Sequence, residues 1–249
     1  MQVRLLEATE DPEQLVCQAA RNDYMEGYVG ETPFEEVMAS IDGDSTEERK
    51  ETLIHRLLAH GHFGPFEHPY ATFAVEGVSR SCMAQITRHR HASFDVQSMR
   101  YVEFDEEDPE PGDVYVHIPE LDEAHIAGRN AEVAAEHKAR SDEELLRRRR
   151  ELYHESIEES FDAYNELLAL GVAPENARMV LPIGTRVNMV VTLNARMLMH
   201  VADIRSAADA QWEVRDMTNQ ILDLAEEWCP ITFEYYNTEM KGRKNRLAP

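Results

Sequence analysis

Four arginines gather in a stretch of the chain that holds almost no acid. Residues 77–102 contain a single acid, Asp95, and the four arginines are Arg80, Arg88, Arg90 and Arg100. A guanidinium group donates two parallel charge-assisted hydrogen bonds to a phosphate or a carboxylate. The whole chain has 48 Asp and Glu against 25 Lys and Arg, so this cluster indicates an anion-binding site. A solvated basic helix end explains the charge alone equally well.

A second stretch, residues 176–205, has the same character. It also has one acid, Asp203, and its four arginines are Arg178, Arg186, Arg196 and Arg205. A helix that starts after Asn194 places Arg196 and His200 on one face and Arg205 roughly opposite, because successive residues turn by about 100°. One helix can therefore touch two ligands. The two stretches predict a site for at least two polyanionic small molecules, of which nucleotides are the obvious class.

The most common nucleotide and hydrolase motifs are absent from the sequence. There is neither a G-x-G-x-x-G nor a G-x-x-x-x-G-K-[ST] pattern, so neither a Rossmann dinucleotide fold nor a P-loop is indicated. There is also no G-x-S-x-G nucleophile elbow. The residues alone therefore lead to an anion site and no further.

The net charge of -23 restricts the partners and the habitat. Such a charge repels nucleic acid and anionic membranes, so we expect neither as a partner. Surface repulsion of this size is tolerated where molar salt screens it within a few ångströms. The composition therefore predicts a halophilic source.

The cysteines and the hydropathy favour a soluble protein of the cytoplasm. Cys17, Cys82 and Cys229 lie far apart without a C-x-x-C pattern, so we expect reduced, buried thiols. We find no run of 18 apolar residues and no basic region followed by an apolar run at the N-terminus. These features predict no membrane segment and no export.

The order of apolar and turn residues predicts an α+β fold. We expect one domain over residues 1–249, in which helices surround a mixed sheet and one helix is long and charged. Strands are expected at 2–7, 70–75, 94–101, 114–118 and 187–193. Helices are expected at 11–25, 34–41, 45–60, 79–86, 121–170, 174–180, 194–205 and 209–228. Pro230 is expected to end the last helix, and residues 241–249 to form a flexible basic tail.

Two other features favour competing functions. Four histidines near Glu67 suggest a metal-dependent phosphohydrolase, but Gly64 and Pro65 break any regular ligand face; they are His55, His60, His62 and His68. The run Arg147-Arg148-Arg149-Arg150 suggests a nucleic-acid-binding module. Because that run stands among glutamates, ion pairs between residues four apart on an exposed helix explain it better.

The string Arg88-His89-Arg90-x2-Ser93-x4-Ser98-x-Arg100 resembles the R-H-R-x2-S-x4-S-x-R signature of the flavin-dependent thymidylate synthases. Three further segments resemble the same family in the same order: the loop at residues 64–68, the segment at 176–182 and the segment from 194 to 213. The resemblance covers residues 52–233, which is most of the chain.

The resemblance implies a reaction and its cofactors. Members of this family convert dUMP to dTMP by reductive methylation, with methylenetetrahydrofolate as carbon donor, FAD as hydride carrier and NADPH as reductant. They have an α+β fold and form homotetramers whose sites are shared between subunits. A reaction with three anionic ligands agrees with the two arginine-bearing stretches.

The resemblance also implies roles for individual residues. Arg205 would stabilise negative charge that develops on the uracil ring. The residues implied in FAD binding are Gly64, Arg88, His89, Arg90, Val96, Asn194, Ala195, Arg196 and His200. The residues implied in dUMP binding are Gln85, Ile86, Thr87, Arg88, Val96, Gln97, Ser98, Met99, Arg100, Arg178 and Arg205.

A few positions depart from the family pattern. Val96 stands where many members have Glu or Gln, Gly64 replaces a common Ser or Thr, and His200 replaces a frequent Asn. None of these changes removes a cation. Ser98 has no general base nearby in the sequence, so we expect it to donate a hydrogen bond to dUMP and not to act as a nucleophile.

Overall fold

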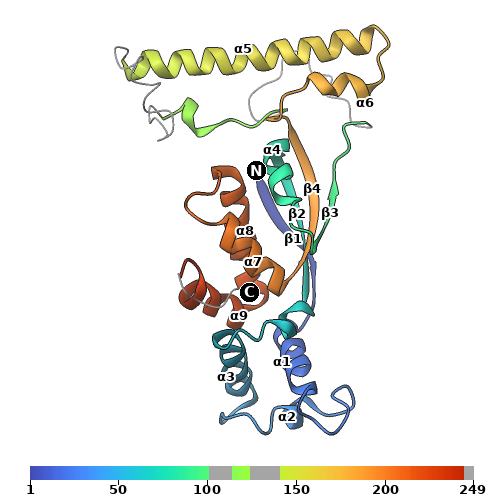
Figure 1. Cartoon of the computed structure of the whole chain (residues 1–249), viewed down its shortest axis with the longest axis vertical. Helices are drawn as coiled ribbons and strands as arrows, with labels where there is room; N and C mark the ends of the chain where they lie inside the picture. The colour runs from blue at the N-terminus through green and yellow to red at the C-terminus, as the bar shows by residue number, and fades with distance from the viewer. Residues whose placement is uncertain (101–113, 124–140, 244–249) are drawn as a thin grey trace. The chain divides into compact units, whose positions relative to one another are not determined.

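The computed structural model describes residues 1–100, 114–123 and 141–243 (Figure 1). The first hundred residues contain three strands and four helices. The strands are β1 (Gln2–Ala8), β2 (Tyr70–Ser79) and β3 (Ala92–Val96). The α-helices are α1 (Pro12–Asn22), α2 (Phe34–Val37), α3 (Thr46–Ala59) and α4 (Arg80–Ile86), and a 3-10 helix covers Gly64–Glu67.

Residues 114–123 and 141–243 are mostly helical and contain one further strand, β4 (Arg186–Asn194). Short 3-10 helices cover Pro119–Leu121 and Arg178–Val180. The α-helices are α5 (Asp142–Ala169), α6 (Pro174–Ala177), α7 (Ala195–Arg205), α8 (Trp212–Trp228) and α9 (Pro230–Tyr235), and a π-helix covers Tyr236–Met240.

The four strands form one sheet in the order β1-β2-β4-β3. β1 pairs antiparallel with β2, and β3 pairs antiparallel with β4, so that Val96 lies opposite Met189. The hydroxyl groups of Thr72 and Thr192, 3.0 Å apart, connect β2 with β4. The predicted α+β class is confirmed, including the long charged helix α5. The pairings β1-β2 and β3-β4 are antiparallel.

Contacts divide the chain into two compact units, which we describe separately. Unit 1 comprises residues 1–76, 82–96 and 188–249, and unit 2 comprises residues 77–81 and 97–187. The chain passes between the units within β2, α4 and β4 and after β3, so each unit consists of several segments.

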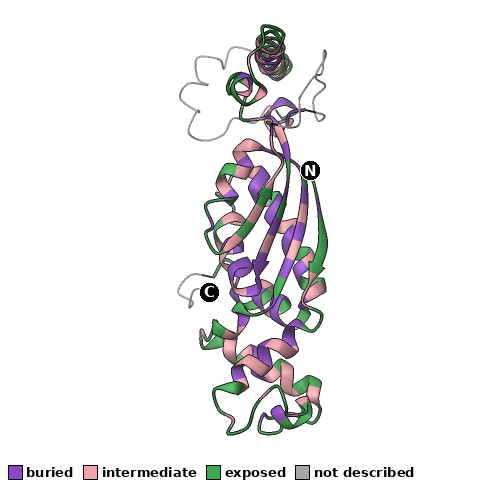
Figure 2. Ribbon diagram, turned by 90° about the vertical axis from the view of Figure 1, so that its right-hand side faces the viewer, coloured by how far each residue is buried: buried purple, intermediate pink, exposed green. Residues whose placement is uncertain are grey.

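The core of unit 1 forms where α7, α8 and α9 and the first three helices bury apolar side chains together with the sheet. Ile54, Phe66, Phe73 and Phe233 are fully buried, and Figure 2 shows buried residues along the strands. The Trp228 indole Nε1 donates to the Thr9 carbonyl at 2.9 Å and thereby ties the end of α8 to the end of β1. This packing fixes α7, which carries three of the predicted cofactor residues, Ala195, Arg196 and His200.

The core of unit 2 lies along one face of α5. Ile157, Phe161 and Tyr164 from α5 pack with Met99 and Tyr115, together with Val114 and Ala177. The Tyr115 hydroxyl lies 2.8 Å from His154 Nδ1. Met99, which lies between Ser98 and Arg100 of the motif, is therefore anchored in this core.

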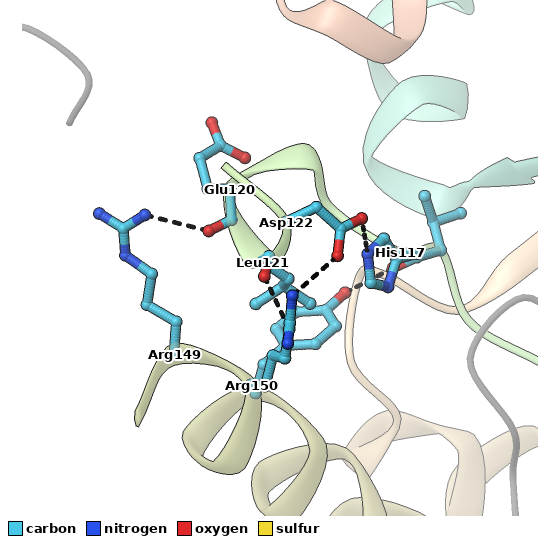
Figure 3. Close-up of polar contacts among 8 residues, drawn as sticks. His117, Glu120, Leu121, Asp122, Arg149 and Arg150 are labelled. Carbon is cyan, nitrogen blue, oxygen red and sulfur yellow. Dashed lines mark hydrogen bonds and ion pairs between the residues drawn. The ribbon is translucent and has the colours of Figure 1, made fainter. Parts of the chain in front are cut away.

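The arginine run of α5 is engaged by acceptors of its own unit, and Figure 3 shows this for Arg149 and Arg150. Arg147 pairs with Glu151 four residues later at 2.7 Å, as predicted. Arg149 donates to the carbonyls of Glu120 and Glu123, both at 3.0 Å. Arg150 donates to the Leu121 carbonyl at 2.8 Å and to the Asp122 carboxylate at 3.2 Å. The run therefore holds the segment at 119–123 against α5.

Local signals predicted several helix starts correctly. The Ser45 hydroxyl accepts from the Glu48 amide at 3.2 Å at the start of α3. The Asn194 side chain accepts from the Met197 amide at 2.7 Å at the start of α7. Gly171, with φ of 83°, follows the end of α5 as predicted. These caps satisfy amides that the first helical turn leaves unpaired.

Other boundaries were predicted wrongly. Over residues 94–100, the strand expected at 94–101 ends at Val96 as β3, because the burial of Met99 in the core of unit 2 takes the chain out of the sheet; Tyr101 lies outside the described residues. The strand expected at 114–118 is a single bridge between Tyr115 and Thr185. Pro230 begins α9 and does not end the helical structure, since proline is tolerated at the first position of a helix.

Two further predictions are only partly covered by the structure. Of the helix expected at 121–170, residues 124–140 lie outside the described residues, and α5 starts at Asp142. Of the basic tail, only residues 241–243 are described. Lys241 Nζ lies 3.4 Å from Asn219 Oδ1, and Arg243 pairs with Glu239 at 2.8 Å. In the described ranges, no helix combines the length and the apolar character that crossing a membrane requires.

Candidate functional site

A pocket of about 330 Å³ opens in unit 1 at the start of α7. Its lining comes from three segments: the 3-10 helix at Gly64–Glu67, the turn before β3, and the junction of β4 with α7. The lining residues are Glu67, His91, Asn194, Arg196, Met197 and His200. Arg196 and His200 lie on one face of α7, as their spacing predicted. The polar groups of the pocket are one guanidinium, one carboxylate, two imidazoles and one amide, which suits a polar ligand that can both donate and accept hydrogen bonds.

Local structure fixes the polar groups of this pocket. Because the Asn194 side-chain oxygen accepts the Met197 amide as a helix cap, its NH₂ group is the part that remains for a ligand. Arg196 forms an ion pair with Glu67, and its guanidinium carbon lies 5.9 Å from the centre of the Phe63 ring. Glu67 thus holds the Arg196 guanidinium at the pocket.

A second polar cluster in unit 1 surrounds Arg205. Its Nε lies 3.0 Å from His89 Nε2, and its Nη2 donates to the Gln85 carbonyl at 2.8 Å. His89 is buried, and its ring lies edge-on to that of His200 with 5.9 Å between centroids. Burial, followed by the charge of Arg205 and by His200, lowers the pKa of His89 to about 4. His89 is therefore a neutral hydrogen-bond acceptor near neutral pH.

The remaining members of the R-H-R motif differ from His89. Arg88 and Arg90 are exposed. Within the ranges 1–100, 114–123 and 141–243, neither guanidinium has a hydrogen bond or an ion pair. Neither residue lines the pocket at α7, and the exposed Gly64, which begins the 3-10 helix at Gly64–Glu67, does not line it either. Arg88 and Arg90 are thus cations open to an anion from solution.

Unit 2 contains the other half of the predicted substrate residues. Arg100 pairs with Glu175 at 2.9 Å, and its amide donates to the Ser98 hydroxyl at 3.3 Å. Arg178 Nε donates to the Glu175 carbonyl at 3.0 Å. Ser98, Arg100 and Arg178 therefore belong to one cluster that converges on Glu175.

Unit 2 also contains Arg80 and Arg186, for which the sequence predicted no individual role. Arg80 donates to the Met99 sulfur at 3.1 Å, and burial, with a smaller effect of Arg178, lowers the pKa of Arg80. Arg186 packs over Gly77, where an added Cβ would collide with the Arg186 guanidinium. Gly77 has a φ of 72°, which also favours glycine. Arg186 thus has a packing role in unit 2.

The remaining predicted residues divide between surface and interior. Thr87 is exposed, whereas Ile86 and Ala195 are buried, so that only their backbone can face a ligand. Gln85, Val96 and Gln97 are partly buried. Three lining residues of the pocket were not in the predicted set, namely Glu67, His91 and Met197. His91 continues the R-H-R motif, and Glu67 lies in the loop that resembles a flavin-contacting segment, so both had a signal in the sequence.

The competing hypotheses find little support in the geometry. Among the described residues, no three His, Cys, Asp or Glu side chains are grouped so as to hold a metal ion. His55 instead packs on Tyr235, with ring centroids 4.6 Å apart, and His60 Nδ1 lies 2.8 Å from the Arg56 carbonyl. Cys82 is buried, which raises the pKa of its thiol and disfavours the nucleophilic thiolate.

Comparisons with known proteins identify a class of nucleotide-modifying enzymes. The chain resembles the crystal structure of a UMP/dUMP methylase, PolB from Streptomyces cacaoi bound with 5-Br dUMP, at a TM-score of 0.72 and 25% sequence identity, over 100% of this chain and 97% of that one. The model of the Thy1 family, described as thymidylate synthase complementing protein, matches residues 4–231.

Curated relatives define the family more narrowly. The chain is 62% identical to the flavin-dependent thymidylate synthase of Haloarcula marismortui and 60% identical to that of Halobacterium salinarum, in each case over 100% of both chains. The chain belongs to the family of flavin-dependent thymidylate synthases, which confirms the prediction from the R-H-R motif. The two organisms also agree with the halophilic source that the charge predicted.

Proposed function

We propose that this protein catalyses the reductive methylation of dUMP to dTMP, with methylenetetrahydrofolate as carbon donor, FAD as hydride carrier and NADPH as reductant. The observation that carries the proposal is the full-length similarity to flavin-dependent thymidylate synthases in a chain whose unit 1 has a polar pocket at α7. The similarity to a methylase bound with 5-Br dUMP supports dUMP as the substrate.

The pocket at α7 fits part of a flavin dinucleotide. Its volume of about 330 Å³ is at the small end for ligand pockets, so it would hold only one portion of the molecule. Asn194, Arg196 and His200 offer hydrogen-bond donors there. The exposed Arg88 and Arg90 would bind the diphosphate, since guanidinium groups match phosphate oxygens. When bound, the flavin supplies the hydride transfer.

The substrate residues have distinct tasks in this proposal. Arg178 and Arg100 bind the phosphate of dUMP, and the Ser98 hydroxyl donates a hydrogen bond to dUMP. Arg205 stabilises the negative charge that develops on the uracil ring, because fixed donors aimed at a developing charge lower the barrier. The two hydrogen bonds of Arg205 go to neutral acceptors, so neither of them offsets its charge.

The proposal extends to the assembly. We propose that residues 1–249 form one domain, that four copies assemble, and that each site takes residues from more than one subunit. The sharing of sites is testable by mixing two inactive variants. The two variants are Arg178→Ala, which changes a residue of unit 2, and Arg196→Ala, which changes a residue of unit 1. Mixed tetramers should regain activity if the two residues of one site come from different subunits, and should stay inactive if every site lies within one chain. Sedimentation would count the subunits.

The reaction itself is tested in one anaerobic experiment. The FAD-loaded protein in molar KCl is reduced with NADPH, and dUMP and methylenetetrahydrofolate are then added. We expect dTMP to form and the flavin to return to its oxidised spectrum, both only when dUMP is present. Flavin reduction without any dTMP at saturating substrates would overturn the proposal.

A further inference from the structure

We propose that His89 is a positioning residue, whose imidazole Nε2 accepts a hydrogen bond from Arg205 Nε and thereby fixes the guanidinium group in the orientation that the reaction needs. The inference rests on the proposed function in one respect, namely the task of Arg205 at the uracil ring. It assigns to His89 a partner within the protein in place of the cofactor contact that the family resemblance implies.

Two hydrogen bonds fix the Arg205 guanidinium group. The Nε to His89 Nε2 distance is 3.0 Å, and the Nη2 to Gln85 carbonyl distance is 2.8 Å. Arg205 is in the last turn of α7, Gln85 is near the end of α4, and His89 follows in the turn after α4. Two acceptors on a planar group fix both its position and its plane. The Nη1 amino group has no hydrogen-bond partner among the described residues, so it is available to a ligand.

His89 is itself held by its surroundings. Its amide donates to the Ile86 carbonyl at 3.1 Å, which closes the turn after α4. Its side chain is buried, at 7% exposure, and it packs edge-on against His200. An imidazole fixed in this way can fix another group in turn, whereas an exposed histidine would adapt to Arg205.

The electrostatics agree with this role. A protonated imidazole has no lone pair at Nε2 and cannot accept from Arg205. The charged or titratable groups that act on His89 are Arg205 and His200, and together with burial they lower its pKa to about 4. The neutral ring therefore carries its proton on Nδ1 and keeps Nε2 as the acceptor. Because the acceptor is neutral, it orients Arg205 without cancelling its charge.

The pocket geometry separates His89 from the cofactor residues. The neighbouring His91 lines the pocket at α7, together with His200 and Arg196, but His89 does not. With Nε2 engaged by Arg205, His89 could offer a ligand only its Nδ1 proton. The two histidines of the motif thus have different partners, although they are two residues apart.

Two nearly isosteric variants test the role. In His89→Gln the side-chain amide reaches the place of Nε2 and offers an acceptor there, whereas in His89→Asn the amide stops at the place of Nδ1. We expect His89→Gln to retain kcat within about threefold, and His89→Asn to lose at least about tenfold in kcat with a smaller change in KM for dUMP, because the lost orientation matters most in the transition state. Both variants should bind FAD as the wild type does.

A variant of Arg205 shows whether His89 acts through it. Lysine has no Nε–H in a planar fork, so Arg205→Lys removes the donor to His89. In that background, His89→Asn should change kcat less than twofold. A loss in Arg205→Lys as large as in the wild-type background would overturn the inference, because the two residues would then act independently. Equal loss in His89→Gln and His89→Asn, accompanied by weaker FAD binding, would overturn it in favour of a cofactor contact.

A measurement without turnover keeps the test independent of the reaction. In ¹⁵N NMR, the Arg205 Nε proton should exchange slowly in the wild type and in His89→Gln, and rapidly in His89→Asn. Similar exchange in all three proteins would contradict the hydrogen bond. If the wild type makes no dTMP at all, the proposed function fails, and this NMR comparison still decides the role of His89.

Discussion

Two pairs of arginines from basic clusters of this chain have different partners in the structure. Arg149 and Arg150 in α5 donate to carbonyl and carboxylate groups of the segment at 119–123 (Figure 3). Arg88 and Arg90 are exposed, and in the part of the chain that the structure describes they have no such partner. The first pair stabilises its own unit, and the second is open to a ligand. The partners of a cation, and not the density of charge, distinguish the two roles.

Arg205 and Arg196 fall between these extremes. Both are held, but Arg196 is held by a carboxylate and Arg205 by two neutral acceptors. A carboxylate cancels much of the charge that an incoming phosphate would feel, whereas a neutral acceptor leaves it. We therefore expect the site arginines to differ in function as well, with Arg205 closest to the chemistry.

The largest expected effect is that of Arg205→Ala on turnover. Removal of one fixed donor from a developing negative charge costs about 100- to 1000-fold in kcat, so dTMP formation should fall by at least about 100-fold. Arg150→Ala, measured in the same assay, should stay within twofold of the wild type. A similar loss in both variants would break the distinction between site and structural arginines.

The next effect concerns substrate binding in unit 2. Arg178→Ala should raise the KM for dUMP by about 10- to 100-fold, because a hydrogen bond to a charged group contributes about 1.5–3 kcal/mol. Arg148→Ala is the matched control, since Arg148 pairs only weakly with Glu151, at 3.5 Å on the surface of α5. Steady-state kinetics over a range of dUMP concentrations measures both. An unchanged KM in Arg178→Ala would remove this residue from the substrate site.

The lowered pKa of His89, the acceptor of Arg205 Nε, predicts that stability depends on pH. The pKa of His89 is about 4 in the folded protein and 6.5 as its ordinary value, so between these pH values the unfolded chain binds a proton that the folded chain does not. The free energy of unfolding should therefore fall by about 1–3 kcal/mol as the pH drops from about 6.5 to about 4. His89→Gln lacks this contribution. Urea unfolding of both proteins at several pH values gives the difference, and parallel curves would contradict the prediction.

The smallest effect is expected in α5. Arg150→Leu loses a part-buried hydrogen bond to the Leu121 carbonyl and an exposed one to the Asp122 carboxylate, which should cost about 1 kcal/mol of unfolding free energy. FAD binding and the KM for dUMP should not change. Weaker FAD binding in this variant would mean that Arg150 also contributes to the FAD site.

The sequence predicted what depends on neighbouring residues and on motif spacing. The caps at Ser45 and Asn194 and the common face of Arg196 and His200 follow from local geometry, and the structure confirms them. The family followed from the spacing of the R-H-R motif, and the comparisons confirm it.

The remaining features depend on contacts between distant residues. Nothing near His89 in the sequence indicates Arg205, 116 residues later, as its partner. The early end of β3 follows from the burial of Met99 in another core, and the partners of Arg149 are backbone carbonyls, which no side-chain pattern reveals. Tertiary packing decides these features.

The contrast between the two arginine pairs is tested most directly by titrating FAD into the apoproteins of two double variants in molar KCl. We expect Arg88→Ala with Arg90→Ala to weaken FAD binding by at least about 30-fold, because two charge-assisted contacts are lost. The variant with Arg149→Ala and Arg150→Ala should bind FAD as the wild type does. Equal weakening in both double variants, or none in the first, would contradict this contrast.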